Sequence, residues 1–148
     1  MLDVRGNELA RFAGQIEGDR VKDPWVSENI VPVVDLPRFD IRIDLLNAFW
    51  DFWMANKANA LCVADFGAPV EAGLLRACVG LDPGKRTWEG PYPMHELGTA
   101  LLLSGNDPDL NRREFIDRPN LVQHDPVDDA LTAGLCWLKV TPALYNFR

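Results

Sequence analysis

The stretch that determines the last helix of this chain runs from residue 123 to 139 and reads QHDPVDDALTAGLCWLK. Asp125 is a favourable N-cap, because its side chain can accept hydrogen bonds from the free amides of a first helical turn. Pro126 then takes the first helical position, where a missing N–H costs nothing. Asp128, three residues after the cap, gives a pattern close to a capping box. The stretch therefore predicts a loop carrying His124 that leads into a helix.

Asp129 is the acid in this stretch that capping does not explain. Helical spacing places it on the side that also carries Ala133, Cys136 and Val140, which we expect to pack against the protein. A carboxylate turned towards the interior is costly unless it is paired or binds a metal ion. His124, five residues earlier, is expected to lie near it. The polar stripe of the same helix is expected to consist of Asp125, Asp128, Thr132 and Lys139.

The spacing of His124 and Asp129 resembles the last motif of the DEDDh family of 3′-to-5′ exonucleases, as do the Asp-Asp-Ala and the apolar run that follow. In that family the histidine is the general base that activates a water, and the aspartate binds one of two divalent metal ions. The resemblance implies that His124 and Asp129 have these roles, with Mg²⁺ or Mn²⁺ as cofactor. The implied substrate is RNA or single-stranded DNA, and the sequence leaves open which of them is cleaved.

The family's second acid follows a strand, in an aromatic–Asp–x–x–apolar pattern at the start of a helix. Residues 60–65 form a short apolar run typical of a buried strand, and residues 69–79 a helix that opens with proline. Glu71 stands in place of the family's aspartate, with Val70 in place of the aromatic residue. Asp65 offers a second carboxylate at the strand end. Both are candidates for the metal ion, and Glu71 is equally explained as a first-turn acid that favours the helix dipole.

The family's first motif, Asp-x-Glu on the central strand of the sheet, does not occur anywhere in the 148 residues. We therefore expect residues 1–148 to form a single α/β domain that is N-terminally incomplete. The expected fold is a ribonuclease H-like mixed sheet flanked by helices, without its first central strand. The resemblance then implies one of two functions. The chain is an exonuclease completed by an upstream segment, or it is a catalytically inactive relative that serves as a binding or interaction module.

The other expected elements follow from periodicity and turn residues. They are a hairpin at 1–4 and 9–16, helices at 24–31, 40–57 and 94–104, and a short strand at 86–88. The wide apolar face of the helix at 40–57, which includes Trp50, predicts core packing rather than a platform for bases. His95 is interpreted as a hydrogen-bonded structural histidine.

Three arginines precede the His124 loop, and they are Arg112, Arg113 and Arg118. They are the best local candidates for binding a substrate phosphate, because guanidinium groups pair well with phosphate oxygens. A solvated polar face explains them as well. The formal net charge of −7 argues against broad electrostatic binding of nucleic acid, but a metal ion held by carboxylates would escape that objection.

Composition is ordinary for a globular domain, with 47% hydrophobic and 25% charged residues. No apolar run approaches the ~18 residues of a membrane helix, and the first residues show no signal-peptide pattern. Cys62, Cys78 and Cys136 are odd in number and widely spaced, which predicts reduced thiols of a cytoplasmic protein and no zinc site. The oligomeric state stays open, a homodimer included. A small acidic protein unrelated to nucleases is the remaining alternative.

Overall fold

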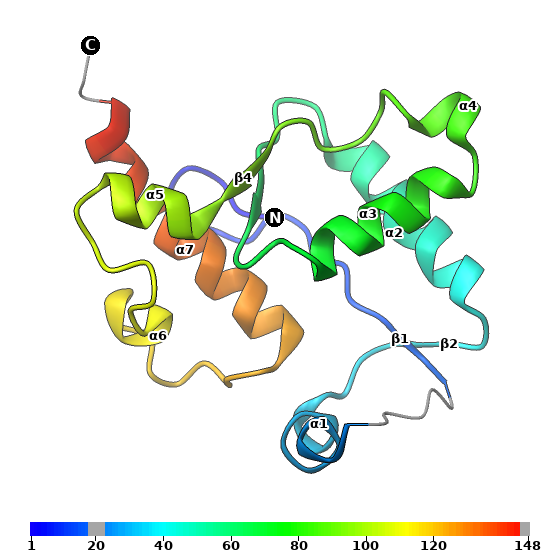
Figure 1. Cartoon of the computed structure of the whole chain (residues 1–148), viewed down its shortest axis with the longest axis horizontal. Helices are drawn as coiled ribbons and strands as arrows, with labels where there is room; N and C mark the ends of the chain where they lie inside the picture. Colours follow the sequence, from blue (N-terminus) through cyan, green and yellow to red (C-terminus); the bar gives the residue numbers. More distant parts are fainter. Residues whose placement is uncertain (18–22, 146–148) are drawn as a thin grey trace.

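The computed structural model describes residues 1–17 and 23–145, and it is a mixed α/β arrangement in which most regular structure is helical (Figure 1). Its helices are α1 (Pro24–Asn29), α2 (Arg42–Asn56), α3 (Val70–Gly80), α4 (Pro83–Arg86), α5 (Leu97–Leu103), α6 (Arg112–Phe115) and α7 (Pro126–Tyr145), with a 3-10 helix η1 (Val31–Val33). Its strands are β1 (Gln15–Ile16), β2 (Arg38–Phe39), β3 (Cys62–Ala64) and β4 (Met94–Glu96). Within these ranges no helix is both long and apolar enough to cross a membrane.

The strands pair as two separate parallel sheets. β1 pairs with β2, and β3 pairs with β4 so that Cys62 lies opposite Met94 and Ala64 opposite Glu96. The expected α/β class is confirmed. The expected single mixed sheet is not what the described residues form, since each sheet has two strands of two or three residues. Parallel pairs this small are held mainly by the helices that cover them.

The N-terminal hairpin is present only as a turn. Leu2 and Glu8 form one antiparallel bridge, and the Asp3 carboxylate accepts from the N–H groups of Arg5 and Asn7 at 2.8 and 2.9 Å. The predicted returning strand at 9–16 is wrong, because only its end is a strand and it pairs with β2 instead. Gly14, just before β1, packs closely against α2: a Cβ at this position would lie only 2.6 Å from the Leu45 side chain.

The strand predicted at 86–88 is also wrong. The strand that the chain forms here is β4, which lies within the range predicted as a helix. Residues 83–86 form α4, capped by Asp82, whose side chain accepts from the Lys85 N–H. β4 begins at Met94, where a helix at 94–104 was expected, and the helix starts only at Leu97. Pro91 and Pro93 favour an extended chain on entry to β4, and pairing with β3 then satisfies its backbone.

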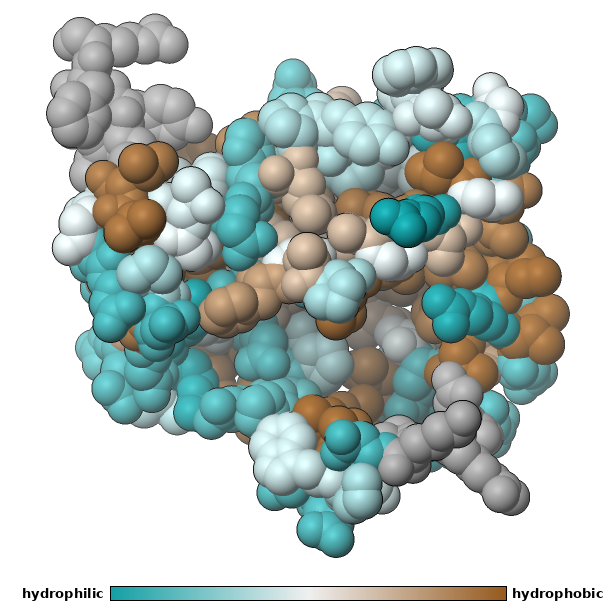
Figure 2. Space-filling view, in the orientation of Figure 1, coloured by the Kyte–Doolittle hydropathy of each residue, from teal (hydrophilic) through white to brown (hydrophobic). Residues whose placement is uncertain are grey.

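Two hydrophobic clusters lie on the two sides of the β3–β4 sheet. One joins α5 to α7 and contains Leu97, Ala100, Leu101, Ala133, Cys136 and Val140, with Val63 of β3 packed against it. The other joins α2 to α3 and contains Leu46, Trp50 and Cys78, which confirms the core role of Trp50. Figure 1 shows α5 and the later part of α7 to the left of β4, and the α2–α4 group to its right. In Figure 2 the apolar residues of this face gather over the α2–α4 group.

Candidate functional site

The start of α7 is built as its sequence predicts. One oxygen of the Asp125 carboxylate accepts from the N–H groups of Val127 and Asp128, at 2.9 and 3.0 Å. Pro126 is the first residue of the helix. The Asp128 carboxylate accepts from the Val122 N–H at 2.7 Å, so it reaches further back than a capping box would. These bonds fix the loop that carries His124 onto the helix.

His124 adopts a left-handed backbone conformation with a φ of 67°, which histidine tolerates better than most residues. Its half-buried ring meets the ring of Trp25 edge-on, with centroids 5.4 Å apart. Trp25 belongs to α1, so this contact connects α1 to the start of α7. Arg113 holds the same loop by donating to the Leu121 carbonyl at 3.0 Å and to the Gln123 side chain at 2.9 Å.

Asp129 is exposed, and the expectation that it faces the interior is wrong. Ala133, Cys136 and Val140 are buried as predicted, whereas Asp129, one turn before Ala133, is not. Partial burial of the carboxyl group raises the pKa of Asp129, and the backbone and charge of His124 oppose that shift. A solvent-facing carboxylate thus lies beside His124 at the start of α7.

Thr132 was expected on the polar stripe of α7, but it is buried. It is 3% exposed, and its hydroxyl has no hydrogen-bond partner within the described part of the chain. The apolar face of α7 is therefore wider than helical spacing suggested, because α7 contacts both α5 and β3.

Asp65 and Arg112 form a bidentate ion pair. The Arg112 Nε and Nη2 atoms donate to the two Asp65 carboxylate oxygens, both at 2.9 Å. The Arg112 side chain is only 12% exposed and that of Asp65 20%. The hydrogen bonds that Arg112 donates to Asp65 raise the pKa of Arg112. Arg112 also donates to the Leu110 carbonyl at 2.7 Å. The predicted metal ligand and the predicted phosphate ligand therefore neutralise one another. Of the three candidate arginines, Arg118 is the exposed one.

Glu71 lies in the first turn of α3, where the sequence placed it. Its Oε2 atom is buried and accepts no hydrogen bond from any described residue. Burial raises the pKa of the nearby Cys62 thiol, and the charge of Glu71 adds to that shift. A buried carboxylate oxygen without a partner is costly, so Glu71 is suited to binding a cation.

Glu96 is a structural residue that the sequence did not reveal. Its carboxylate accepts from the backbone N–H groups of Phe66 and Gly67, at 2.9 and 3.0 Å, and so fixes the turn between β3 and α3. The predicted helix at 94–104 included Glu96, whereas Glu96 is the last residue of β4. The neighbouring His95 packs its ring 5.3 Å from that of Trp137, but its buried Nε2 atom has no partner in the described ranges, contrary to the expected hydrogen-bonded histidine.

The predicted site residues fall into three places. His124 and Asp129 lie together at the start of α7, where Arg113 holds the loop. Asp65 is paired with Arg112, and Glu71 lies in the first turn of α3. The exposed Arg118 belongs to none of these three places. In the view of Figure 1 both helices begin towards the middle of the molecule. Among residues 1–17 and 23–145, no three His, Cys, Asp or Glu side chains are grouped so as to hold a metal ion.

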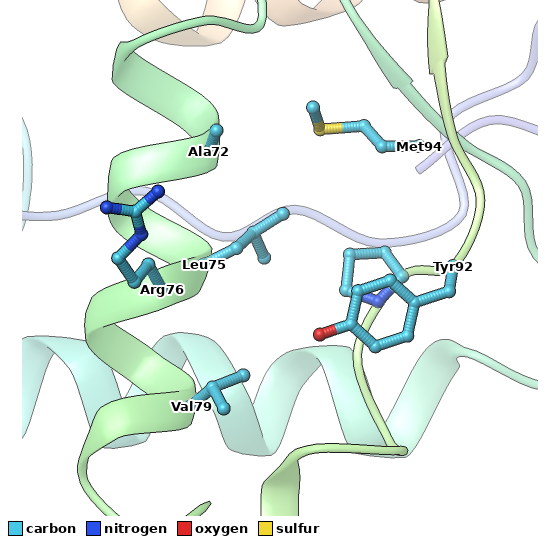
Figure 3. A pocket seen from close by; sticks show the side chains of 7 residues that line it. Ala72, Leu75, Arg76, Val79, Tyr92 and Met94 are labelled. Atoms are coloured by element: carbon cyan, nitrogen blue, oxygen red, sulfur yellow. The ribbon is translucent and has the colours of Figure 1, made fainter.

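A cavity of about 350 Å³ lies between α3 and the chain that enters β4 (Figure 3). The side chains of Tyr92 and Met94 extend across it towards Leu75 of α3. Apart from Arg76 and the Tyr92 hydroxyl, its walls are apolar, and none of the predicted site residues lines it. The cavity is therefore distinct from the acidic positions.

Compared with protein families, curated proteins and solved structures, the chain matches none of them.

Proposed function

We propose that this chain is a metal-dependent 3′-to-5′ exonuclease domain that hydrolyses phosphodiester bonds of RNA or single-stranded DNA. The observation that supports the proposal most directly is the exposed carboxylate of Asp129 beside His124 at the start of α7. The order of β3, α3, β4, α5 and α7 fits the later part of a ribonuclease H-like fold. The three free thiols suit a reducing compartment such as the cytoplasm.

Asp129 and Glu71, in the first turns of two different helices, are each free to contact a Mg²⁺ or Mn²⁺ ion. Asp129 is reachable from solvent, and Glu71 has an oxygen that no described group engages. Asp65 does not fit, because Arg112 occupies both of its oxygens. Mg²⁺ commonly needs only one or two carboxylates together with substrate phosphate and water. The ion would neutralise charge on the phosphate that is attacked.

His124 supplies the base of the reaction. In its neutral form it takes a proton from the attacking water, whose oxygen forms a bond to phosphorus. The bond between phosphorus and the leaving sugar oxygen breaks, that oxygen takes up a proton from solvent water, and a nucleoside monophosphate is released. His124 then gives its proton to solvent and is neutral again. The contact with Trp25 and the left-handed backbone limit the positions that the His124 ring can take.

The test is hydrolysis of a labelled ten-nucleotide RNA and its DNA counterpart by the full chain with Mn²⁺ or Mg²⁺. We expect Asp129→Asn to lower the rate by at least about a hundredfold. His124→Ala should lower it by roughly 10²- to 10⁴-fold. Asp51→Asn, which alters an exposed aspartate of α2, is the matched control and should leave the rate unchanged. An unchanged rate for Asp129→Asn would contradict the assignment.

The stability of Asp129→Asn separates a functional from a structural role. Because the pKa of Asp129 is raised, the ionised carboxylate is disfavoured in the folded state, and its charge opposes folding at neutral pH. The variant should therefore melt at the same or a higher temperature at pH 7. Any gain should vanish below pH 3.8, the ordinary value, where the carboxyl is protonated in folded and unfolded chains alike.

A second function is favoured by the Asp65–Arg112 pair. Because Asp65 and Arg112 pair with each other, Asp65 does not bind a metal ion and Arg112 does not bind a phosphate. A module that binds single-stranded nucleic acid without cleaving it is consistent with this. It predicts oligonucleotide binding with no monophosphate released in either Mg²⁺ or Mn²⁺.

A further inference from the structure

Phe66 is a strained and exposed aromatic residue at the carboxyl end of β3. Its φ is 60°, a conformation that is uncommon for a bulky side chain and costs free energy. Its side chain is nevertheless 65% exposed, so burial of the ring does not compensate for that cost.

The surrounding groups hold Phe66 in this conformation. Glu96 accepts from its N–H at 2.9 Å and from that of Gly67 at 3.0 Å. The Arg112 guanidinium lies over the ring, 5.4 Å from its centroid, and is itself fixed by both oxygens of Asp65. The ring is thus supported on one side and open to solvent elsewhere.

Phe66 lies close in sequence to Glu71, one of the candidate metal ligands. The turn that carries it leads, within five residues, to Glu71 in the first turn of α3. Trp88 and Tyr92 are exposed too, but no described cation lies over either ring, and Trp25 already contacts His124. A ring that is fixed at its backbone and supported on one side is prepared to stack against a flat group.

We propose that Phe66 stacks on a base of a single-stranded nucleic acid and so places that nucleotide at the carboxyl end of β3. This inference rests on the proposed function, and it deepens it by naming a base contact. Stacking uses the face of a base and tolerates any sequence, so the site should require a base without selecting among the four. It also gives an acidic chain a contact that does not depend on positive charge.

The experiment compares two fluorescein-labelled ten-nucleotide DNA strands by fluorescence anisotropy with the full chain in Mg²⁺. Phosphorothioate linkages at the 3′ end slow hydrolysis, and in one strand the last three nucleotides lack bases. The unaltered protein should bind the abasic strand about tenfold more weakly. Phe66→Gly should bind both strands with that lower affinity. Leu103→Ala, which alters a residue of similar exposure on α5, should keep the tenfold difference.

The melting temperature of Phe66→Gly shows whether the Phe66 ring serves binding or folding. Glycine adopts the φ of this position without strain, so Phe66→Gly should melt at the same or a higher temperature than the unaltered protein. A clear drop in melting temperature would mean that the ring serves folding, and would overturn the inference.

The outcomes separate the two proposals. If Phe66→Gly keeps the tenfold difference, or the unaltered protein binds both strands equally, the stacking role is refuted while exonuclease function stands. If the unaltered protein binds neither strand and hydrolyses no substrate, both proposals are refuted together.

Discussion

At the scale of single residues, the Asp65–Arg112 pair is the most buried ion pair in the described ranges. Both side chains are mostly buried and both Asp65 oxygens are engaged, so removing either partner leaves the other without compensation. We expect Asp65→Ala to lower the free energy of unfolding by about 2–3 kcal/mol. Urea denaturation measures this loss.

A double-mutant cycle tests whether the pair acts as a unit. Arg112→Ala in the Asp65→Ala background should cost much less than it does alone, because the uncompensated charge is already gone. The exposed pair of Glu8 and Arg11 is the matched control, and Glu8→Ala should have little effect on stability. Additive losses for Asp65 and Arg112 would mean that each side chain matters for other contacts.

At the scale of elements, α7 depends on its cap. The Asp125 carboxylate satisfies two amides of the first turn, which have no partner within the helix. Asp125→Ala should therefore destabilise the protein by about 1 kcal/mol, whereas Asp51→Ala in the middle of α2 should have little effect. Thermal unfolding followed by circular dichroism gives both values.

The same substitution has a consequence for the site. Asp125 and Asp128 hold the loop of His124 against the start of α7. If the proposed function is right, Asp125→Ala should also slow hydrolysis, because His124 loses its fixed position. Unchanged hydrolysis with lowered stability would show that Arg113 and Asp128 hold the loop without the Asp125 cap.

At the scale of the whole molecule, the two hydrophobic clusters differ in size. Among the side chains that the structure describes, six buried residues form the cluster of α5 and α7, and three form the cluster of α2 and α3. Each contains one buried thiol, Cys136 in the first and Cys78 in the second. Burial raises the pKa of both, to about 11 for Cys136, so both stay protonated and unreactive at neutral pH while folded.

These thiols can report on the two clusters separately. We expect Cys78 to be alkylated by iodoacetamide at lower urea concentrations than Cys136, because its cluster buries less apolar surface. Mass spectrometry of peptides after a short labelling pulse gives both curves, and labelling of fully unfolded protein is the control. Coincident curves would mean that the chain unfolds as one cooperative unit.

The sequence by itself determined the local features. The cap and the first turn of α7, the long helix α2 and the order of β3 and α3 all follow from side chains within a few residues. Caps and helical periodicity are local interactions, so they can be read without knowing what lies across the fold.

Only the tertiary structure decided the rest. Asp129 is exposed to solvent and Thr132 is buried. Asp65 forms an ion pair with Arg112, and residues 94–96, predicted as part of a helix, form β4. In each case the partner is distant: Arg112 lies 47 residues from Asp65, and Glu96 lies 30 residues from Phe66. Burial, ion pairing and strand pairing depend on which surfaces meet, and that is settled by packing of the whole chain rather than by the pattern of any one stretch.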